Sequence, residues 1–258
     1  CLPIRNKMRV VLSIAGSDSG GGAGIQADIK SALYHEVFMT TAITAVTAQN
    51  TKGVQDICVL EADFVKTQIL SVLNDFEVNT IKIGMLGSKN LVLKVKEVIE
   101  KLDIPIILDP VAISRAGSKL ITDEAIESLK ELFDYSYLIT PNKYEAKLFF
   151  NVASIEDIKN LKKQNSNILF KNMIESKNKT VDILLKKDGS IIEFESLKAD
   201  EANTHGTGCS YSASIASLIA RDFCLEDAIK ISKEYIYQAI KNAPNLGSGN
   251  GPINHILK

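Results

Sequence analysis

The sequence has few cysteines, no excess charge of one sign and no long hydrophobic run. Its 258 residues include four cysteines, at positions 1, 58, 209 and 224, without a C-x-x-C pair. This spacing argues against a zinc site and a disulfide framework. Scattered cysteines are typical of proteins in a reducing cytosol, so we expect a cytoplasmic location. No apolar run approaches the roughly 18 residues of a membrane span, and we expect no membrane partner.

The two signs of charge are almost equally represented. Thirty Lys and Arg residues and 31 Asp and Glu residues give a formal net charge of −1. Nucleic-acid binding relies on clustered cations, and no basic block stands out, so nucleic acid is not an expected partner. The length lies near the limit of about 250–300 residues for one hydrophobic core. We expect one domain over residues 8–258, preceded by an N-terminal extension, residues 1–7, outside the fold.

Segments typical of strands and of helices alternate along the chain. Apolar or β-branched runs predict strands at residues 9–15, 37–48, 79–83, 104–108 and 135–140. Helical spacing occurs at residues 25–34, 62–76, 88–102, 122–133 and 225–243, a run of small residues at 211–220 also predicts helix, and a further helix opens after Pro141. An Asp188-Gly189 turn between two strand-like runs predicts a hairpin. Residues 151–179 are polar and indicate one helix. The alternation indicates an α/β fold with a mainly parallel sheet.

A glycine-rich loop at residues 17–24 joins the first predicted strand to the first helix. It lacks the G-x-G-x-x-G register and the Gly-Lys-[Ser/Thr] of a P-loop, which disfavours a dinucleotide oxidoreductase. A ligand could lie against its backbone, with Asp18 offering a carboxylate to the ligand's hydrogen-bond donors. A tight turn with a purely structural role is the alternative.

A second glycine turn, His205-Gly206-Thr207-Gly208-Cys209, precedes a run of small residues that predicts a close-packed helix. Free N–H groups and the helix dipole make such a start attractive to phosphate. Cys209 lies in the first turn, where the same field favours the thiolate. We therefore expect its pKa to fall from about 8.5 by a unit or more. The alternative is a glycine-capped packing helix with an inert cysteine.

Polar residues follow several of the predicted strands. Gln49 ends the second strand, and its amide can donate and accept hydrogen bonds side by side. Met85 can line a ring pocket or fill the core. Asp109 lies at a strand end, where open α/β sheets hold their ligands. Asn142 and Glu145 have the spacing of a capping box, and they are also candidates to organise Mg²⁺ or phosphate.

An ordered set of motifs covers almost the whole chain and resembles the hydroxymethylpyrimidine/phosphomethylpyrimidine kinases, a family of the ribokinase-like superfamily. The motifs are residues 15–24, 47–51, 82–86, 108–111, 140–145, 203–209 and 249–255. The resemblance implies a three-layer α/β/α sandwich with a small β flap, and a homodimer. It also implies phosphorylation of 4-amino-5-hydroxymethyl-2-methylpyrimidine, and then of its monophosphate, by ATP with Mg²⁺ in thiamine biosynthesis.

The resemblance further implies roles in holding substrate and transferring the phosphoryl group. The pyrimidine would be held by Asp18, Gln49 and Met85, with Val111 nearby. Gly206, Gly208 and the amides around Cys209 would form the anion hole. Cys209 would be the base that faces the hydroxymethyl oxygen, where most of the superfamily has Asp.

On the nucleotide side, the resemblance implies that Asp109 and Glu145 hold Mg²⁺ and that Asn142 acts with Glu145 on metal and phosphate. The other residues expected to bind the nucleotide are Thr207, Lys187 and Lys233. Lys187-Asp188-Gly189 stands in for the family's usual Lys-Gly-Gly, a departure that leaves the nucleotide-side loops less well defined.

Two alternatives stay open for function. Some close relatives phosphorylate pyridoxal and use a second cysteine in a flap, but this chain has no cysteine between Asp109 and Ser118. A catalytically inactive pyrimidine-binding module is the other alternative. The intact Gly-Thr-Gly-Cys motif that ends at Cys209, the Asn-x-x-Glu motif that ends at Glu145, and Lys187 argue against it.

Overall fold

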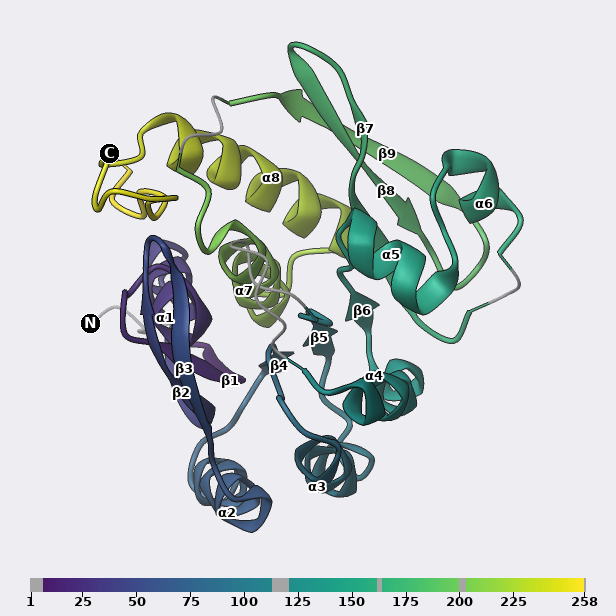
Figure 1. Ribbon diagram of the computed structural model, residues 1–258. Helices are drawn as coiled ribbons and strands as arrows, with labels where there is room; N and C mark the ends of the chain where they lie inside the picture. Colours follow the sequence, from purple (N-terminus) through teal and green to yellow (C-terminus); the bar gives the residue numbers. More distant parts are fainter. Residues whose placement is uncertain (1–6, 113–120, 162–163, 200–202, 258) are drawn as a thin grey trace, which may run out of the picture.

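The protein is built around one nine-stranded sheet, in the order β3-β2-β1-β4-β5-β6-β7-β8-β9 (Figure 1). The structure, a computed structural model, describes residues 7–112, 121–161, 164–199 and 203–257. The strands are β1 Val10–Asp18, β2 Phe38–Asn50, β3 Gly53–Val59, β4 Thr80–Ile83, β5 Ile106–Leu108, β6 Leu138–Ile139, β7 Asn167–Glu175, β8 Lys179–Leu185 and β9 Ile191–Leu197.

Strands β2, β1, β4, β5, β6 and β7 pair in parallel with their neighbours. Only β3, at one edge, and β8 and β9, at the other, pair antiparallel within the described chain. The carboxyl ends of the six parallel strands therefore meet at one edge of the sheet, which is where such sheets hold ligands.

Helices cover both faces of the sheet, and the predicted three-layer sandwich is confirmed. One face carries α1 Gly24–Tyr34, α7 Thr207–Ala220 and α8 Leu225–Lys241. The other carries α2 Ala62–Leu73, α3 Lys89–Ile99, α4 Asp123–Leu129, a 3-10 helix Lys130–Tyr135, α5 Lys143–Phe150 and α6 Ile155–Lys159. On β1, Val11 packs toward the first group, while Leu12 and Ile14 pack toward the second. Burial on both faces explains why these strands read as continuous apolar runs.

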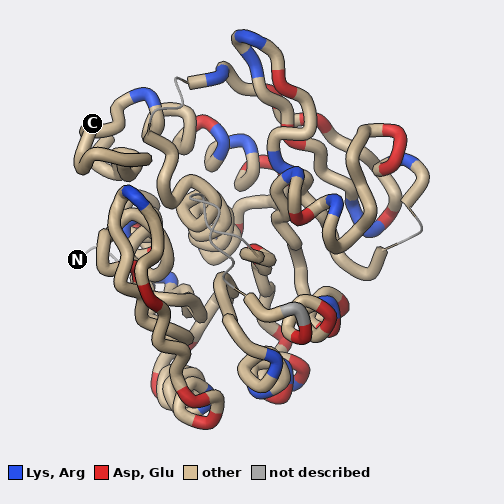
Figure 2. The backbone as a smooth tube through the Cα atoms, in the orientation of Figure 1, with Lys and Arg blue, Asp and Glu red and all other residues tan. Residues whose placement is uncertain are grey.

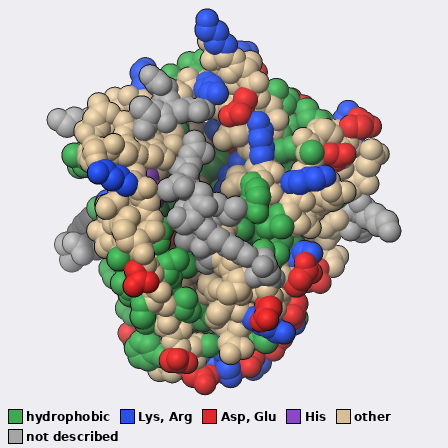
Figure 3. Space-filling model, viewed as in Figure 1, with side chains coloured by type: hydrophobic (Ala, Val, Ile, Leu, Met, Phe, Trp, Pro, Cys, Tyr) green, Lys and Arg blue, Asp and Glu red, His purple; other side chains and the backbone are tan. Residues whose placement is uncertain are grey.

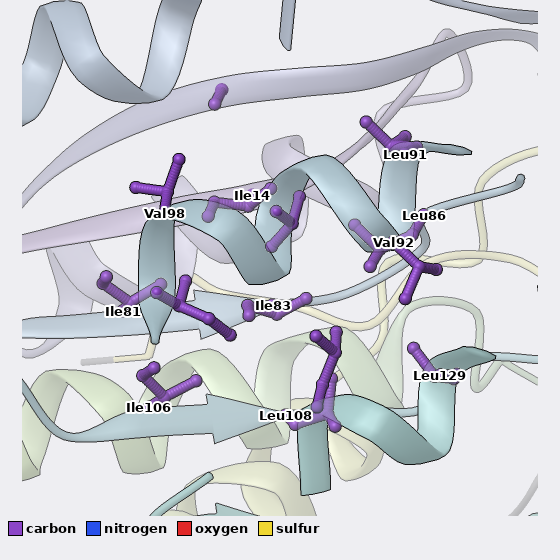
Figure 4. Close-up of a cluster of buried hydrophobic side chains, with 14 of the residues drawn as sticks. Ile14, Ile81, Ile83, Leu86, Leu91, Val92, Val98, Ile106, Leu108 and Leu129 are labelled. Carbon is purple, nitrogen blue, oxygen red and sulfur yellow. The ribbon is translucent and has the colours of Figure 1, made fainter. Parts of the chain in front are cut away.

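The core under α3 shows how this packing is built (Figure 4). Ile83 of β4 and Leu108 of β5 belong to the same buried cluster as Leu91 and Val92 of α3. All four side chains are fully buried. Each such side chain contributes about 1.5–3 kcal/mol to the free energy of folding when buried.

Two strands were not predicted from the sequence. Strand β3 forms a hairpin with the end of β2, and β7 lies in the polar segment that was expected to contain one helix. The hairpin predicted at Asp188-Gly189 is confirmed, since Lys186 N–H donates to the Ser190 carbonyl at 2.9 Å and Gly189 has φ +87°. Of the expected N-terminal extension, residues 1–6 lie outside the described chain.

Acidic and basic residues are both spread over much of the chain, as Figure 2 shows, and neither sign is confined to one part of the described residues. Hydrophobic and charged side chains stand next to one another on the face drawn in Figure 3. Among the residues that the structure describes, no helix has both the length and the apolar character needed to cross a membrane.

Candidate active site

A cavity of about 660 Å³ lies at the carboxyl ends of the parallel strands. It brings together every predicted site residue except one. Those that line it are Asp18, Gln49, Met85, Asp109, Val111, Asn142, Glu145, Gly206, Thr207, Gly208, Cys209 and Lys233. These residues come from strand ends, loops and helices that are far apart in the sequence, and the fold brings them together at this edge of the sheet.

Lys187 is the exception, and its predicted place in the nucleotide site is not supported. Strand β8 runs antiparallel to β7, so it starts at the pocket edge and ends at the opposite edge of the sheet. Lys187 follows that far end, is exposed, and donates its N–H to Asn167 at the start of β7. Parallel strands carry two other lysines to the pocket, Lys82 of β4 and Lys171 of β7.

Asp18 organises the glycine-rich loop from within. Its carboxylate accepts hydrogen bonds from the N–H groups of Gly20 at 2.8 Å, Gly22 at 3.0 Å and Ala23 at 2.8 Å, and it lies 2.8 Å from Nε2 of His205. Burial alone would raise the pKa of Asp18, but the bonds from His205 and the loop outweigh it and lower that pKa. Asp18 therefore shapes the pocket by holding the loop closed, and it also lines the cavity.

At the end of the pocket near β2 and β4, the amide of Gln49 lies close to an apolar surface that includes Met85. Gln49 accepts a hydrogen bond from Thr47 Oγ1 at 3.2 Å, and its Nε2 lies 3.3 Å from Nε2 of His205. Met85 is buried beside Gly16, where a Cβ would lie 3.3 Å from the Met85 sulfur. An aromatic ring with exocyclic donors and acceptors suits this combination of surfaces.

The start of α7 is held against the glycine-rich loop. Gly206 has φ +82°, and a Cβ there would overlap the Gly22 carbonyl, so only glycine fits. Thr207 Oγ1 donates to the Thr204 carbonyl at 2.7 Å. A Cβ at Gly208 would lie 3.7 Å from both the Asp109 carboxylate and the Lys171 ammonium. The start of α7 thus lies next to a charged cluster.

That cluster consists of Asp109, Lys171 and Glu145. Lys171 Nζ donates to Asp109 Oδ1 at 2.9 Å, and Thr140 Oγ1 donates to the same oxygen at 3.1 Å. Burial lowers the pKa of Lys171, but the two carboxylates outweigh it and raise that pKa. Burial likewise opposes ionisation of Asp109, but Lys171 and Lys82 hold its pKa below the usual value. Asp109 and Lys171 are therefore a charged pair.

Glu145 differs from Asp109, since burial raises its pKa to about 7. It forms the predicted capping box, in which its Oε2 accepts the Asn142 N–H at 2.9 Å and Asn142 Oδ1 accepts the Glu145 N–H at 3.0 Å. The described residues contain no cluster of three or more His, Cys, Asp or Glu. Two carboxylates nevertheless fit Mg²⁺, which proteins commonly hold with one or two carboxylates plus substrate phosphates.

Cys209 lies between two helix starts. Its sulfur accepts the N–H of Gly24, the first residue of α1, and Cys209 itself is in the first turn of α7. Burial nevertheless raises the pKa of the thiol to about 11. Lys82 opposes that rise, while Asp28 and Asp109 add to it. The expectation of a lowered thiol pKa is wrong, because burial outweighs the lowering effects of Lys82 and of the hydrogen bond from the Gly24 N–H.

An ion pair below Cys209 was missed from the sequence. Lys82 Nζ lies 2.8 Å from Asp28 Oδ2, Ser13 Oγ donates to the same oxygen at 2.6 Å, and both charged side chains are 0% exposed. Burial disfavours the ammonium, but Asp28 and the neighbouring anions raise the pKa of Lys82. The charged form is thus fixed under the pocket floor.

A third pair occupies the α8 side of the pocket. Lys233 Nζ lies 2.7 Å from Asp182 Oδ2, and Tyr211 donates its hydroxyl to the same oxygen at 2.8 Å. Asn172 N–H donates to Asp182 Oδ1 at 2.7 Å. Apolar side chains of Leu197, Ile236 and Ile240 line the same cavity. The structure adds five charged or titratable residues in or beside the predicted site: Lys171, Lys82, Asp28, Asp182 and His205.

Known proteins are similar to this chain in sequence and in fold. The phosphomethylpyrimidine kinase family model matches residues 18–254. The hydroxymethylpyrimidine/phosphomethylpyrimidine kinases of Haemophilus influenzae and Bacillus subtilis are 39% and 35% identical, over 97% and 95% of this chain and 97% and 93% of theirs.

Two solved structures are also similar. Phosphomethylpyrimidine kinase from Clostridium difficile has a TM-score of 0.76 and 34% identity, over 90% of this chain and 100% of that one. Pyridoxal kinase from Staphylococcus aureus in complex with ADP has a TM-score of 0.85 and 25% identity, over 96% and 93%. The chain belongs to the phosphomethylpyrimidine kinase family.

Proposed function

We propose that the protein transfers phosphate from ATP to 4-amino-5-hydroxymethyl-2-methylpyrimidine, and then to its monophosphate, in thiamine biosynthesis. One observation carries this proposal: a single continuous cavity joins a ring-binding end to an anion-binding end, with Cys209 between them. Gln49 and Met85 form the first end, and Lys171 and the start of α7 form the second. The names of the relatives agree with a pyrimidine substrate.

Phosphoryl transfer needs alignment and charge neutralisation more than covalent chemistry from the protein. Lys171 and the free N–H groups near Gly208 supply fixed positive charge for the transferring group. Asp109 and Glu145 hold Mg²⁺, which when bound neutralises phosphate charge. Lys233, held by Asp182, contacts the nucleotide from the α8 side, and Asn142 positions Glu145 through the capping box.

Cys209 is the proposed base for the hydroxymethyl proton. Its thiolate is a minor form at neutral pH, because burial raises the pKa to about 11. General-base catalysis contributes roughly 10²–10⁴-fold, so much of the rate must come from alignment and charge. The contribution of Cys209 should therefore grow with pH.

A kinase assay with the pyrimidine and pyridoxal in competition tests the substrate. We expect ADP release driven by the pyrimidine, with the larger kcat/KM. A larger kcat/KM for pyridoxal would establish the second candidate, which the fold similarity to pyridoxal kinase favours. No ADP release with either substrate, in the presence of ATP and Mg²⁺, would indicate an inactive binding module.

We also propose a cytoplasmic homodimer, as the family resemblance implies. Sedimentation at micromolar protein concentration should give twice the mass of the 28.2 kDa chain.

A further inference from the structure

The segment that follows α8 lies over two rims of the pocket without lining it. Residues 245–252, which we call the strap, form no helix and no extended strand. In Figure 1 this segment, in yellow, lies above α1 and the turn between β2 and β3. Most of the strap is exposed. The proposed reaction assigns these residues no role.

The first contact of the strap is with the turn between β2 and β3. Gly249 N–H donates to Thr51 Oγ1 at 3.2 Å, and a Cβ at Gly249 would overlap the Thr51 carbonyl. A Cβ at Gly247 would overlap the Thr51 side chain. Thr51 is two residues after Gln49 on the chain. The strap therefore contacts the turn that follows Gln49, whose amide is proposed to bind the pyrimidine.

The second contact is with the loop that leads into α7. Gly251 N–H donates to Asn203 Oδ1 at 3.1 Å, and the Gly251 carbonyl accepts the His205 N–H at 3.1 Å. Asn250 Oδ1 accepts the Thr204 N–H at 2.8 Å. A Cβ at Gly251 would overlap Asn203 Oδ1. These bonds fix the backbone immediately before Gly206.

The strap also reaches the glycine-rich loop. A Cβ at Gly22 would lie 3.2 Å from Cβ of Pro252, and His205 packs against the same glycine. Three segments that build the pocket thus converge on the strap. Alternate glycines, 247, 249 and 251, occur where it presses against backbone or side chains of those segments. A chain with side chains at these positions could not lie so close.

We propose that the strap sets the spacing between the turn that carries Gln49 and the start of α7 that carries Cys209. Gly249 and Gly251 are positioning residues in this scheme, since neither lines the pocket. The spacing matters because the pyrimidine must span both segments, and a displacement of about 1 Å in a reacting group can cost roughly 10²-fold in rate. This inference rests on the proposed kinase function.

Gly249→Ala is a clean probe of the first contact. Gly249 is exposed and its φ is outside the left-handed region, so alanine opens no core cavity and strains no dihedral angle. The N–H that bonds to Thr51 is retained. The added methyl overlaps the Thr51 carbonyl, so the strap and the turn must move apart. We expect the KM for the pyrimidine to rise about tenfold, with the KM for ATP within about twofold of wild type.

Gly251→Ala probes the second contact and should act differently. It displaces Asn203 and with it the start of α7, so we expect kcat to fall about tenfold or more. Gly189→Ala is the control, because a Cβ at Gly189 meets nothing within 4 Å and the position lies at the far edge of the sheet. Its KM and kcat values should match those of wild type.

Hydrogen exchange separates this inference from the kinase proposal, because it needs no substrate. Amides of residues 47–55 should exchange faster in Gly249→Ala than in wild type and in Gly189→Ala. Unchanged exchange in that peptide would overturn the inference, even if the wild type proves inactive. An equal rise in both KM values would also overturn it, since a general loss of structure would explain that result.

Discussion

Three lysines around the pocket each pair with a buried aspartate: Lys82 with Asp28, Lys171 with Asp109, and Lys233 with Asp182. The positive charges that a nucleotide would meet are therefore already fixed in place by the protein. Preorganised charges of this kind need no rearrangement during the reaction, which is where electrostatic catalysis gains its advantage.

Replacement of Lys171 by methionine should separate its role from that of Lys187. Lys171→Met removes the cation that faces Gly208 and leaves two buried carboxylates without it. We expect kcat to fall at least 10²-fold and stability to fall by about 3–5 kcal/mol. Lys187→Met, at an exposed turn, should leave both unchanged. Steady-state kinetics and urea unfolding give the comparison, and a comparable kinetic loss in Lys187→Met would restore Lys187 to the nucleotide site.

The pH dependence of turnover tests Cys209. Because the thiol pKa is raised to about 11, the thiolate fraction rises with pH throughout the range from 7 to 9.5. We expect kcat to rise over that range in the wild type. Cys209→Ala should be about 10²–10⁴-fold slower, with a flatter profile and a nearly unchanged KM for ATP. Near-normal turnover in Cys209→Ala would remove it from the role of base.

Glu145 should cost the protein stability while serving its activity. Its pKa is about 7 when folded, against a usual 4.5, so the folded state holds an extra proton between these values. The protonated carboxyl of Glu145 therefore favours the folded state, fully so below about pH 4.5. This stabilisation is lost as the pH rises through 7, where the buried carboxyl must ionise. The stability of Glu145→Gln should not fall over this pH range, because glutamine does not ionise.

Urea unfolding at pH 5 and pH 7.5 measures the difference. Relative to wild type, Glu145→Gln should gain stability at the higher pH, while its kinase activity falls through loss of the carboxylate proposed for Mg²⁺. The capping bond from Asn142 N–H can persist, since glutamine retains a carbonyl oxygen. A stability difference that is the same at both pH values would contradict the raised pKa.

At the level of elements, the shape of the pocket depends on close contacts between loops and the first turns of helices. The glycine-rich loop, the start of α7 and the start of α1 meet around Cys209, and Gly206 is the point of closest approach. No side chain fits there.

Gly206→Ala should therefore separate α7 from the glycine-rich loop. The change combines a left-handed φ with an overlap on the Gly22 carbonyl, and each effect costs about 1–3 kcal/mol. We expect a lower Tm and a nearly complete loss of kcat. Calorimetry and kinetics check this, with Gly189→Ala as a variant that shares the left-handed φ but not the overlap. Equal Tm values for the two variants would show that the contact with Gly22 is unimportant.

Most elements were predictable because apolar periodicity and glycine exits mark them directly. Strand β7 was not, because its neighbours in sequence are polar and its outer half, after Lys171, is largely exposed. Lys187 was expected on the nucleotide side from the family resemblance, but β8 runs antiparallel to β7, a direction that the sequence does not reveal, and Lys187 follows its far end. A usable signal did exist: Lys82, Lys171 and Asp182 are charged residues inside apolar strands, which is unusual unless each is paired.

At the scale of the whole molecule, the sheet order determines the site. Residues from Asp18 to Lys233 reach one cavity because six strands point the same way. The parallel α/β class could be predicted from the sequence. The charge pairs could not, since each depends on side-chain distances between segments far apart in the chain.

Ligand binding should stabilise the whole fold, because the cavity draws on most of the strands. The pyrimidine at 100 times its Kd should add about 2.7 kcal/mol to the free energy of unfolding. For a protein of this size that corresponds to a rise in Tm of roughly 5–10 °C. Thermal unfolding measures the shift, and Gln49→Ala at the same ligand concentration should show a smaller one. An equal shift in that variant would place the pyrimidine elsewhere.

The Lys82–Asp28 pair also constrains how this sequence can diverge. Loss of either partner leaves an uncompensated buried charge, at a cost of about 3–5 kcal/mol, whereas replacement of both by apolar residues is often neutral. Natural proteins have only about 5–15 kcal/mol of stability in total. Descendants of this gene should therefore keep both residues or exchange both, and lineages that carry only one of them should be rare.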